Sequence, residues 1–314
     1  MTSSALSRDV SVKTKVSRSR RGVDTRPLVW PSIAALLVWM IVPLVLTLYF
    51  SFRNYSLVDP TLTGWAGLGN YTYLLTDDSF ITSIINTILL VGGVLIATIV
   101  FGTAFAVLFD QEFFGQGVAR LFVIAPFFVM PTVAALVWKN LLMDPVNGLF
   151  AYMARGVGLE PITWFTNAPL ISIGLIVAWQ WVPFATLILL TAMQSLDREQ
   201  IEAARMDGAK PIDRFRHIIL PHLARPITVV VMIETIFLLG IFAEILVTTS
   251  GGPGDASTNL VYLVYKTALL QFDVGGGSAG GIVAIVLATM LANTMATMPP
   301  ADPPPTSNCS SAVL

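Results

Sequence analysis

The sequence predicts an all-α membrane protein with six transmembrane helices. Of its 314 residues, 55% are hydrophobic and only 12% are charged, whereas about a quarter of the residues in a soluble globular domain carry charge. The mean hydropathy is +0.75. The charged residues also leave long intervals without any charge, and about 20 apolar residues in a helix suffice to cross the hydrocarbon core of a bilayer. A water-soluble fold is therefore excluded.

Six charge-poor intervals are candidates for membrane spans, namely 28–50, 81–108, 120–139, 170–193, 227–247 and 275–298. The first follows a basic leader, but it is longer than the core of about 7–15 residues in a signal peptide, so we interpret it as an uncleaved span. The third contains Pro126 and Pro131, which predict a kink. The fifth is expected to cross the membrane in spite of Glu234 and Glu244, and the sixth is rich in glycine.

The distribution of Lys and Arg predicts the orientation of these spans. If the N-terminus lies inside, fourteen of the 18 basic residues fall on the inside, seven of them in residues 1–27 and six in residues 194–226. The outside then carries only four, which are Arg53, Lys139, Arg155 and Lys266. Basic residues concentrate in cytoplasmic loops. An even number of spans therefore predicts that both termini are cytoplasmic.

The two ends of the chain are predicted to lie outside the transmembrane domain, which we place at residues 28–298. Residues 1–27 are expected to be disordered and to act through their positive charge as an inside-retention signal rather than as a specific lipid or nucleic-acid site. Residues 299–314 are rich in Pro and Ser and are interpreted as a disordered extension. No nucleic-acid partner is expected, and membrane lipid is the solvent of the domain.

Composition also excludes several kinds of chemistry. The chain has one cysteine, Cys309, and no pair of Cys or His residues at the spacing of a structural metal site, so neither an internal disulfide nor a bound metal is predicted. No Gly-x4-Gly-Lys-Ser/Thr phosphate loop occurs in the sequence. We therefore expect that the chain is not an enzyme and binds no cofactor itself.

Residues 194–221 form the longest polar loop that the predicted topology places inside. Their helix start and stop signals predict a short helix-turn-helix. Asp197 is a candidate N-cap with Gln200 completing a capping box, and Gly208 can supply a left-handed stop. Pro211 suits the first turn of a second helix, which Pro221 is expected to end. The apolar residues of this second helix fall on one face, so the loop is expected to need a partner surface.

The same loop resembles the EAA loop of the permease subunits of bacterial ABC importers. The positions that carry the resemblance are Glu202, Ala203, Ala204, Gly208, Ile218, Leu220 and Pro221. The resemblance extends over residues 28–292 and is strongest to the MalF-type carbohydrate permeases with the type I (MetI-like) fold, especially those for polyols such as mannitol and sorbitol. From about Thr294 the chain departs from that pattern, because these permeases usually end in a basic stub; a frameshift or a truncation would also give such an end.

This resemblance implies a division of labour between subunits in the bacterial cytoplasmic (inner) membrane. It implies a second permease subunit, two ATP-binding subunits that use ATP and Mg²⁺, and an extracytoplasmic solute-binding protein. The seven EAA positions would then couple the permease to the ATPase, with Glu202 and Gly208 at the joint. The chain itself would form half of the path for a sugar or polyol.

Polar residues inside the spans are candidates for that path. A charge at mid-bilayer costs on the order of 2.5–3.5 kcal/mol, so Glu234 and Glu244 are functional candidates; on one continuous helix they would point about 80° apart. For Glu244 a contact with substrate hydroxyls, a hydrogen bond to another helix and exposure at the interface all remain open, and for Glu234 a structural role is favoured. Asn86 and Asn293 are further polar positions in the spans, and an interhelical hydrogen bond is open to either.

Gln180 and its neighbour Trp179 are further candidates for the substrate path, because sugars are commonly held by aromatic faces and a few amides. Core packing and placement at the membrane interface remain alternatives for both residues. The rival function is a proton-coupled secondary transporter that uses Glu234 or Glu244 as a relay. That rival gives no reason for the loop at 194–221.

Overall fold

The structure is a computed structural model that describes residues 26–59, 61 and 63–296. The predicted leader, up to residue 25, and the predicted tail 299–314 lie outside the described residues. The chain divides into two compact units, Met1–Leu46 and Thr47–Leu314. The helices and strands are α1 Arg26–Ser51, β1 Arg53–Asn54, β2 Gly64–Trp65, α2 Gly69–Thr76, α3 Asp78–Phe109, α4 Gln116–Ile124, η1 Ala125–Phe128, α5 Pro131–Val137, η2 Trp138–Leu142, α6 Leu149–Gly156, α7 Trp164–Asn167, α8 Pro169–Gln194, α9 Arg198–Met206, α10 Pro211–Arg214, η3 Phe215–Ile219, α11 Leu220–Leu238, α12 Ala243–Thr248, α13 Leu260–Tyr265, η4 Lys266–Leu270 and α14 Val274–Ala296.

Five of these helices are long and apolar enough to cross a membrane, and a sixth span results if the pair Gln116–Phe128 and Pro131–Leu142 is counted as one broken span. The prediction of six spans therefore holds only with that broken pair included. In the first unit, the described side chains of α1 up to Leu46 are exposed. A span that is apolar all round and exposed is stable where lipid surrounds it.

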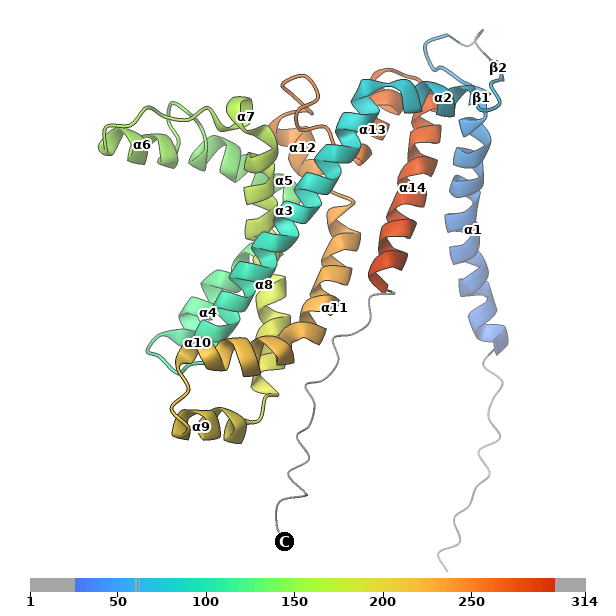
Figure 1. Ribbon diagram of the computed structural model, residues 1–314. Coiled ribbons are helices and arrows are strands. Elements are labelled where there is room, and N and C mark those ends of the chain that lie inside the picture. Colours follow the sequence, from blue (N-terminus) through green and yellow to red (C-terminus); the bar gives the residue numbers. More distant parts are fainter. Residues whose placement is uncertain (1–25, 60, 62, 297–314) are drawn as a thin grey trace, which may run out of the picture. The chain divides into compact units, whose positions relative to one another are not determined.

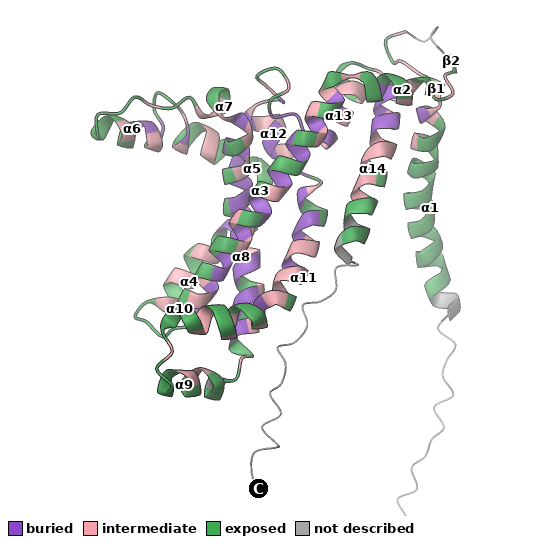
Figure 2. Ribbon diagram, in the orientation of Figure 1, coloured by how far each residue is buried: buried purple, intermediate pink, exposed green. Residues whose placement is uncertain are grey.

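The second unit is built around α3 and α8, which pack along their length (Figure 1). Small residues permit the close approach: a Cβ on Gly102 would lie 2.7 Å from the Cβ of Ala185. Burial on α3 and α11 lies mostly on one side of each helix, whereas buried residues surround most of α8 (Figure 2). Two hydrophobic clusters fill the bundle, one around Val94 and Val177 and another around Ala106 and Leu189.

The third span is broken rather than kinked. Its two halves meet at 109°, where Val129 and Met130 adopt extended conformations before Pro131. A residue before proline disfavours the helical region, so the chain leaves the helix at this point. The sequence located the break correctly but underestimated it.

The predicted fifth span at 227–247 is wrong at its outer end. Its helix ends at Leu238 and a separate short helix, α12, begins at Ala243. The break contains Gly240, and glycine in a helix interior costs about 1 kcal/mol relative to alanine. The Ile241 carbonyl that the break frees accepts a hydrogen bond of 2.6 Å from the Asn259 side chain. Glu234 and Glu244 therefore lie on different helices, and their expected angular separation does not apply.

The outer connections are held by polar side chains. The Asn70 amide donates 2.9 Å hydrogen bonds to the carbonyls of Ser51 and Arg53, and β1 pairs antiparallel with β2. Gly275 at the start of α14 lies against this connection, since a Cβ there would be 2.3 Å from the Arg53 carbonyl oxygen. These contacts fix the start of the last described span.

Candidate functional site

The loop between α8 and α11 has the helix-turn-helix form that the sequence predicts. Asp197 caps α9, because its side chain accepts a 3.0 Å hydrogen bond from the Glu199 amide. Gly208 follows α9 with a φ of +76°, which is the left-handed conformation that glycine adopts without strain. Pro211 is the first residue of α10. The local signals in this loop were therefore sufficient to place both helices.

Pro221 does not end the second helix, contrary to the prediction. The π-helical turn η3 leads directly into α11, and the Leu220 amide closes it by bonding to the Phe215 carbonyl. Proline lacks an amide hydrogen and clashes with the carbonyl four residues before it. The wider π turn moves that carbonyl out of register, so a long helix, Pro211–Leu238, runs from the loop into the membrane span.

The EAA positions lie in two parts of the loop. One part is exposed on α9, and the other lies next to residues that pack in the core. Glu202, Ala203 and Gly208 are exposed, and α9 makes at most glancing contacts with the other described elements. Ile218 is half-buried and Leu220 and Pro221 are exposed, while the neighbouring Ile219 packs on the hydrophobic cluster of the inner half of the bundle. The loop therefore presents α9 at the end of a firmly seated α11 (Figure 1).

Glu234 is fully buried between α11 and α3. One of its carboxylate oxygens accepts a hydrogen bond of 2.6 Å from the Thr98 hydroxyl, and among the described residues the other has no hydrogen-bond partner. A buried charge without full pairing is costly. The Thr98 bond joins α3 to α11, and the structural role of Glu234 stays a prediction.

Glu244 lies in the first turn of α12 and is 5% exposed. The helix packs against α5 and α8, and its last turn is tied to η2 because the Lys139 ammonium donates 2.9 Å to the Val247 carbonyl. Two short helices that each follow a break, α5 and α12, therefore pack against one another. Discontinuous helices of this kind line ligand sites in some membrane transporters.

Gln180 is buried and serves the break in the third span. Its amide nitrogen donates a 3.0 Å hydrogen bond to the Val129 carbonyl, and its amide oxygen has no partner among the described residues. Trp179 points elsewhere: it is 36% exposed and packs edge to face on Trp138 with ring centroids 5.8 Å apart. The structure thus brings Gln180 to a helix break but does not bring Trp179 beside it.

The Gly-rich segment after α12 is a compact, internally bonded loop. Asn86 on α3 donates to the carbonyls of Asp255 and Thr258 at 2.9 and 3.0 Å, which corrects the expected interhelical bond to one between a helix and a loop. Asp255 also forms a 2.8 Å ion pair with Lys266. Burial opposes the charge of Asp255, but hydrogen bonds with Lys266 and neighbouring hydroxyls outweigh that effect and hold its pKa below the usual value.

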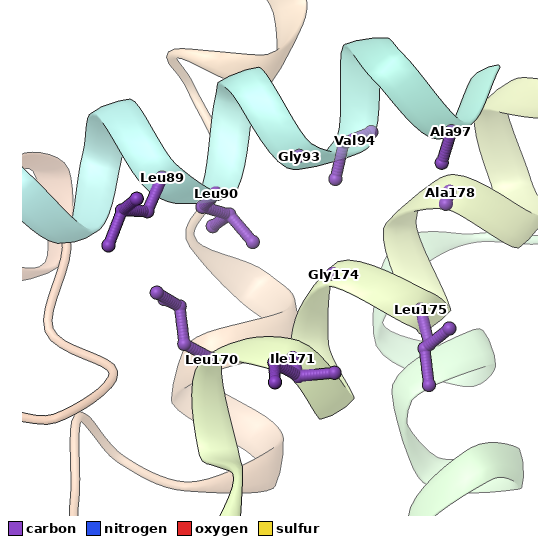
Figure 3. A pocket seen from close by; sticks show the side chains of 10 residues that line it. All are labelled: Leu89, Leu90, Gly93, Val94, Ala97, Leu170, Ile171, Gly174, Leu175 and Ala178. Carbon is purple, nitrogen blue, oxygen red and sulfur yellow. The ribbon is translucent and has the colours of Figure 1, made fainter. Parts of the chain in front are cut away.

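A pocket of about 370 Å³ lies between α3 and α8 and is lined by apolar residues alone. Figure 3 shows that its side chains, among them Leu89, Leu170 and Leu175, contribute only carbon atoms. A sugar needs hydrogen-bond partners for its hydroxyls when it leaves water. This pocket therefore lacks the groups that a carbohydrate site requires.

Three residues with structural roles at these sites were not identified from the sequence. They are Thr98, Asn259 and His222, and each bonds to a group on another element. Asn259 did carry a signal, because it stands at the N-cap of α13. The other two have no local pattern that points to their partners.

The overall fold is that of an ABC importer permease. A chain of a bacterial ABC transporter involved in the import of the acidic polysaccharide alginate superposes with a TM-score of 0.73 at 21% identity, covering 87% of this chain and 93% of that one. The sequence profile of the inner membrane component of binding-protein-dependent transport systems matches residues 116–298. That match covers more than half of the chain.

Two relatives extend the similarity beyond that region. The probable ABC transporter permease protein y4oQ of Sinorhizobium fredii is 36% identical over 267 residues, which cover 83% of this chain and 86% of that protein. The trehalose/maltose transport system permease protein MalF of Thermococcus litoralis is 30% identical over 262 residues, covering 83% and 88%. The chain belongs to the family of binding-protein-dependent transport system inner membrane components. The resemblance to ABC permeases is thereby confirmed, whereas a preference for polyols is not.

Proposed function

We propose that the chain is the permease subunit of an ATP-driven carbohydrate importer and that residues 194–221 couple it to a separate ATPase. The observation that carries the coupling is the exposed helix α9, with Glu202, Ala203 and Gly208, displayed on a seated α11. The sequence holds no phosphate loop of its own. The transport that we propose needs a source of ATP hydrolysis. An ATPase subunit that binds the exposed surface of α9 would supply it.

The proposal includes a second permease and a solute-binding protein, because among the described residues the pocket between α3 and α8 is lined by apolar residues alone. Glu244 and Gln180 at the two helix breaks are the proposed contacts for substrate hydroxyls, and Glu234 is proposed as a structural group. Membership of the family and the relative named for trehalose and maltose transport support a sugar as the substrate. A polyol is the finer alternative that the sequence suggested.

The proposed location is the bacterial cytoplasmic membrane with both termini in the cytoplasm. The excess of Lys and Arg in residues 1–27 and 194–226 supports this orientation. It places α9 on the side where ATP is available. Labelling of an exposed cysteine introduced at Met206, which is 90% exposed, should then occur only when the reagent reaches the cytoplasmic side.

The test of the coupling role is substitution of Gly208. Gly208→Val forces a β-branched residue into a positive φ, which costs roughly 1–2 kcal/mol or more, although no atom lies within 4 Å of the position. Gly208→Asn is the matched control, because asparagine tolerates this conformation. We expect the valine variant, but not the asparagine variant, to lose ATPase association or substrate-stimulated hydrolysis. Normal stimulated hydrolysis with Gly208→Val would falsify the assignment.

A proton-coupled secondary transporter is the rival function. It predicts that the isolated chain in liposomes accumulates substrate along a proton gradient and that Glu234→Gln abolishes this uptake. We expect no uphill uptake without ATP and the partner chains. Proton-driven uptake by the purified chain would favour the rival.

A further inference from the structure

The position of α9 depends on the two ends of its segment, because the helix itself hardly packs on the other described elements. At its far end Gly208, with a φ of +76°, reverses the chain between α9 and α10. At its near end only Ser195 and Leu196 separate the end of α8 at Gln194 from the capping residue Asp197. Whatever fixes these residues sets the direction in which α9 leaves the bundle.

His222 on α11 makes this connection. Its Nε2 atom lies 3.0 Å from the Ala192 carbonyl oxygen and 3.3 Å from the Ser195 hydroxyl. The Ser195 hydroxyl donates to the same Ala192 carbonyl at 2.7 Å. A carbonyl oxygen can only accept, so Nε2 must carry the proton in this arrangement. The imidazole therefore ties the last turn of α8, where the Ala192 carbonyl also accepts bonds from the Ser195 amide and hydroxyl, to the first turn of α11.

The base of this link is rigid. Leu223, next to His222, is fully buried, and it packs with Ile219 in the hydrophobic cluster of the inner half of the bundle. Buried side chains in such a cluster cannot move without opening a cavity. His222 therefore fixes Ser195 relative to α11. Ser195 lies two residues before Asp197, the residue that caps α9.

We propose that His222 is a positioning residue for coupling, which locks the start of α9 to the base of α11 so that both ends of the loop move together. The inference rests on the proposed function only in assigning α9 to the ATPase. If the loop meets an ATPase, the link makes displacement of α9 act on α8 and α11 as one body. Without the link, α9 can swing about Ser195 and Gly208 while the spans stay in place.

The chain supplies a matched control, because it has only two histidines. The other, His217, bonds through Nδ1 to the Asp213 carbonyl at 2.9 Å within its own helical segment. This bond does not join the helix to another element. Substitution of His217 changes the polarity and size of a side chain in the loop but leaves the link between α8 and α11 intact.

The first measurement follows the position of α9 in the full-length chain in nanodiscs. Spin labels are placed at Glu199→Cys on α9 and Glu112→Cys after α3, both exposed, with Cys309→Ser removing the single native thiol. We expect His222→Leu to broaden the distance distribution about twofold, and His222→Asn to do the same because its amide is too short. His222→Gln, whose amide can replace Nε2–H, and His217→Leu should keep the narrow distribution.

The second measurement is the number of ATP molecules hydrolysed per substrate transported by the assembled importer. Loss of one hydrogen bond of this kind changes an equilibrium constant about fivefold. We therefore expect His222→Leu to raise the number of ATP molecules hydrolysed per substrate about fivefold, at an unchanged yield of the complex. His222→Gln should restore the wild-type ratio. An unchanged distance distribution in His222→Leu, or the same broadening in His217→Leu, would overturn the inference. Failure of the wild-type chain to bind any ATPase would instead refute the proposed function and leave the label result standing.

Discussion

The Thr98 hydroxyl donates a 2.6 Å hydrogen bond to the Glu234 carboxylate and thereby joins α3 to α11 inside the bundle. Glu234 is fully buried and lies near the end of the long helix Pro211–Leu238, which starts in the loop that we assign to the ATPase. The same helix carries His222, twelve residues before Glu234. Its two cross-links thus join this helix to α8 and to α3.

The first prediction concerns this pair. Thr98→Val keeps the shape of the side chain but removes the only described partner of the Glu234 carboxylate, so we expect a loss of about 1–3 kcal/mol in the free energy of unfolding. Thr191→Val is the control, because Thr191 is exposed and bonds only to the Leu187 carbonyl of its own helix. Thermal unfolding of the solubilised protein measures both variants. Equal stability of the two would contradict a structural role for the pair.

The continuous spans could be predicted because hydropathy is a local property of the chain. The helices α3 and α8 extend only one to three residues beyond the predicted intervals at each end. The caps of the loop at 194–221 were likewise local, since Asp197 and Gly208 act within their own turns.

The prolines located the break in the third span, but neither its extent nor the break after Leu238 could be predicted, because the groups that satisfy the freed carbonyls come from distant parts of the chain. Gln180 serves Val129, and Asn259 serves Ile241. In a bilayer an unpaired carbonyl costs several kcal/mol, so each break exists only where tertiary structure brings an amide to it. The prediction that Pro221 ends the helix was wrong for a related reason. No local sequence pattern indicates the π turn that precedes it.

The second prediction uses the close approach of α14 to the outer connection. A Cβ at Gly275 would lie 2.3 Å from the Arg53 carbonyl oxygen and 3.3 Å from the Tyr55 amide nitrogen, and backbone atoms cannot yield as side chains do. We expect Gly275→Ala to lower the unfolding free energy by about 1–3 kcal/mol. At Gly93 no atom lies within 4 Å, so Gly93→Ala should be neutral or stabilising by up to about 1 kcal/mol. Urea or thermal unfolding compares the two, and similar losses in both would refute the argument.

The third prediction is a dependence on acidic pH that originates at the ion pair of Asp255 and Lys266. The pKa of Asp255 is held below its usual value in the folded protein, so the carboxylate contributes stability above the unfolded pKa of about 3.9. That contribution disappears as the pH falls through the lower, folded pKa. Asp255→Asn should flatten the acid limb of a plot of melting temperature against pH, and an unchanged acid limb in this variant would contradict the prediction.

The last prediction concerns Glu244, the carboxylate on α12. It is buried on a short helix that packs on α5, and a desolvated carboxylate there can accept two charge-assisted hydrogen bonds from vicinal hydroxyls. Such bonds are worth about 1.5–3 kcal/mol each, which corresponds to a loss of at least tenfold in transport for Glu244→Ala. If the carboxylate contacts substrate, the loss should differ among sugars or polyols that differ at one hydroxyl, and the yield of the complex and its substrate-free ATPase activity should remain.

Lys139→Met separates this role from the packing of α12. It removes the bond to the Val247 carbonyl that ties the same helix to η2, but it leaves the carboxylate in place. Lys139→Met should therefore lower the yield and affect all substrates alike. If Glu244→Ala behaved in the same way as Lys139→Met, with poor assembly and a uniform loss for every substrate, Glu244 would hold α12 in the bundle and would not be part of the substrate path.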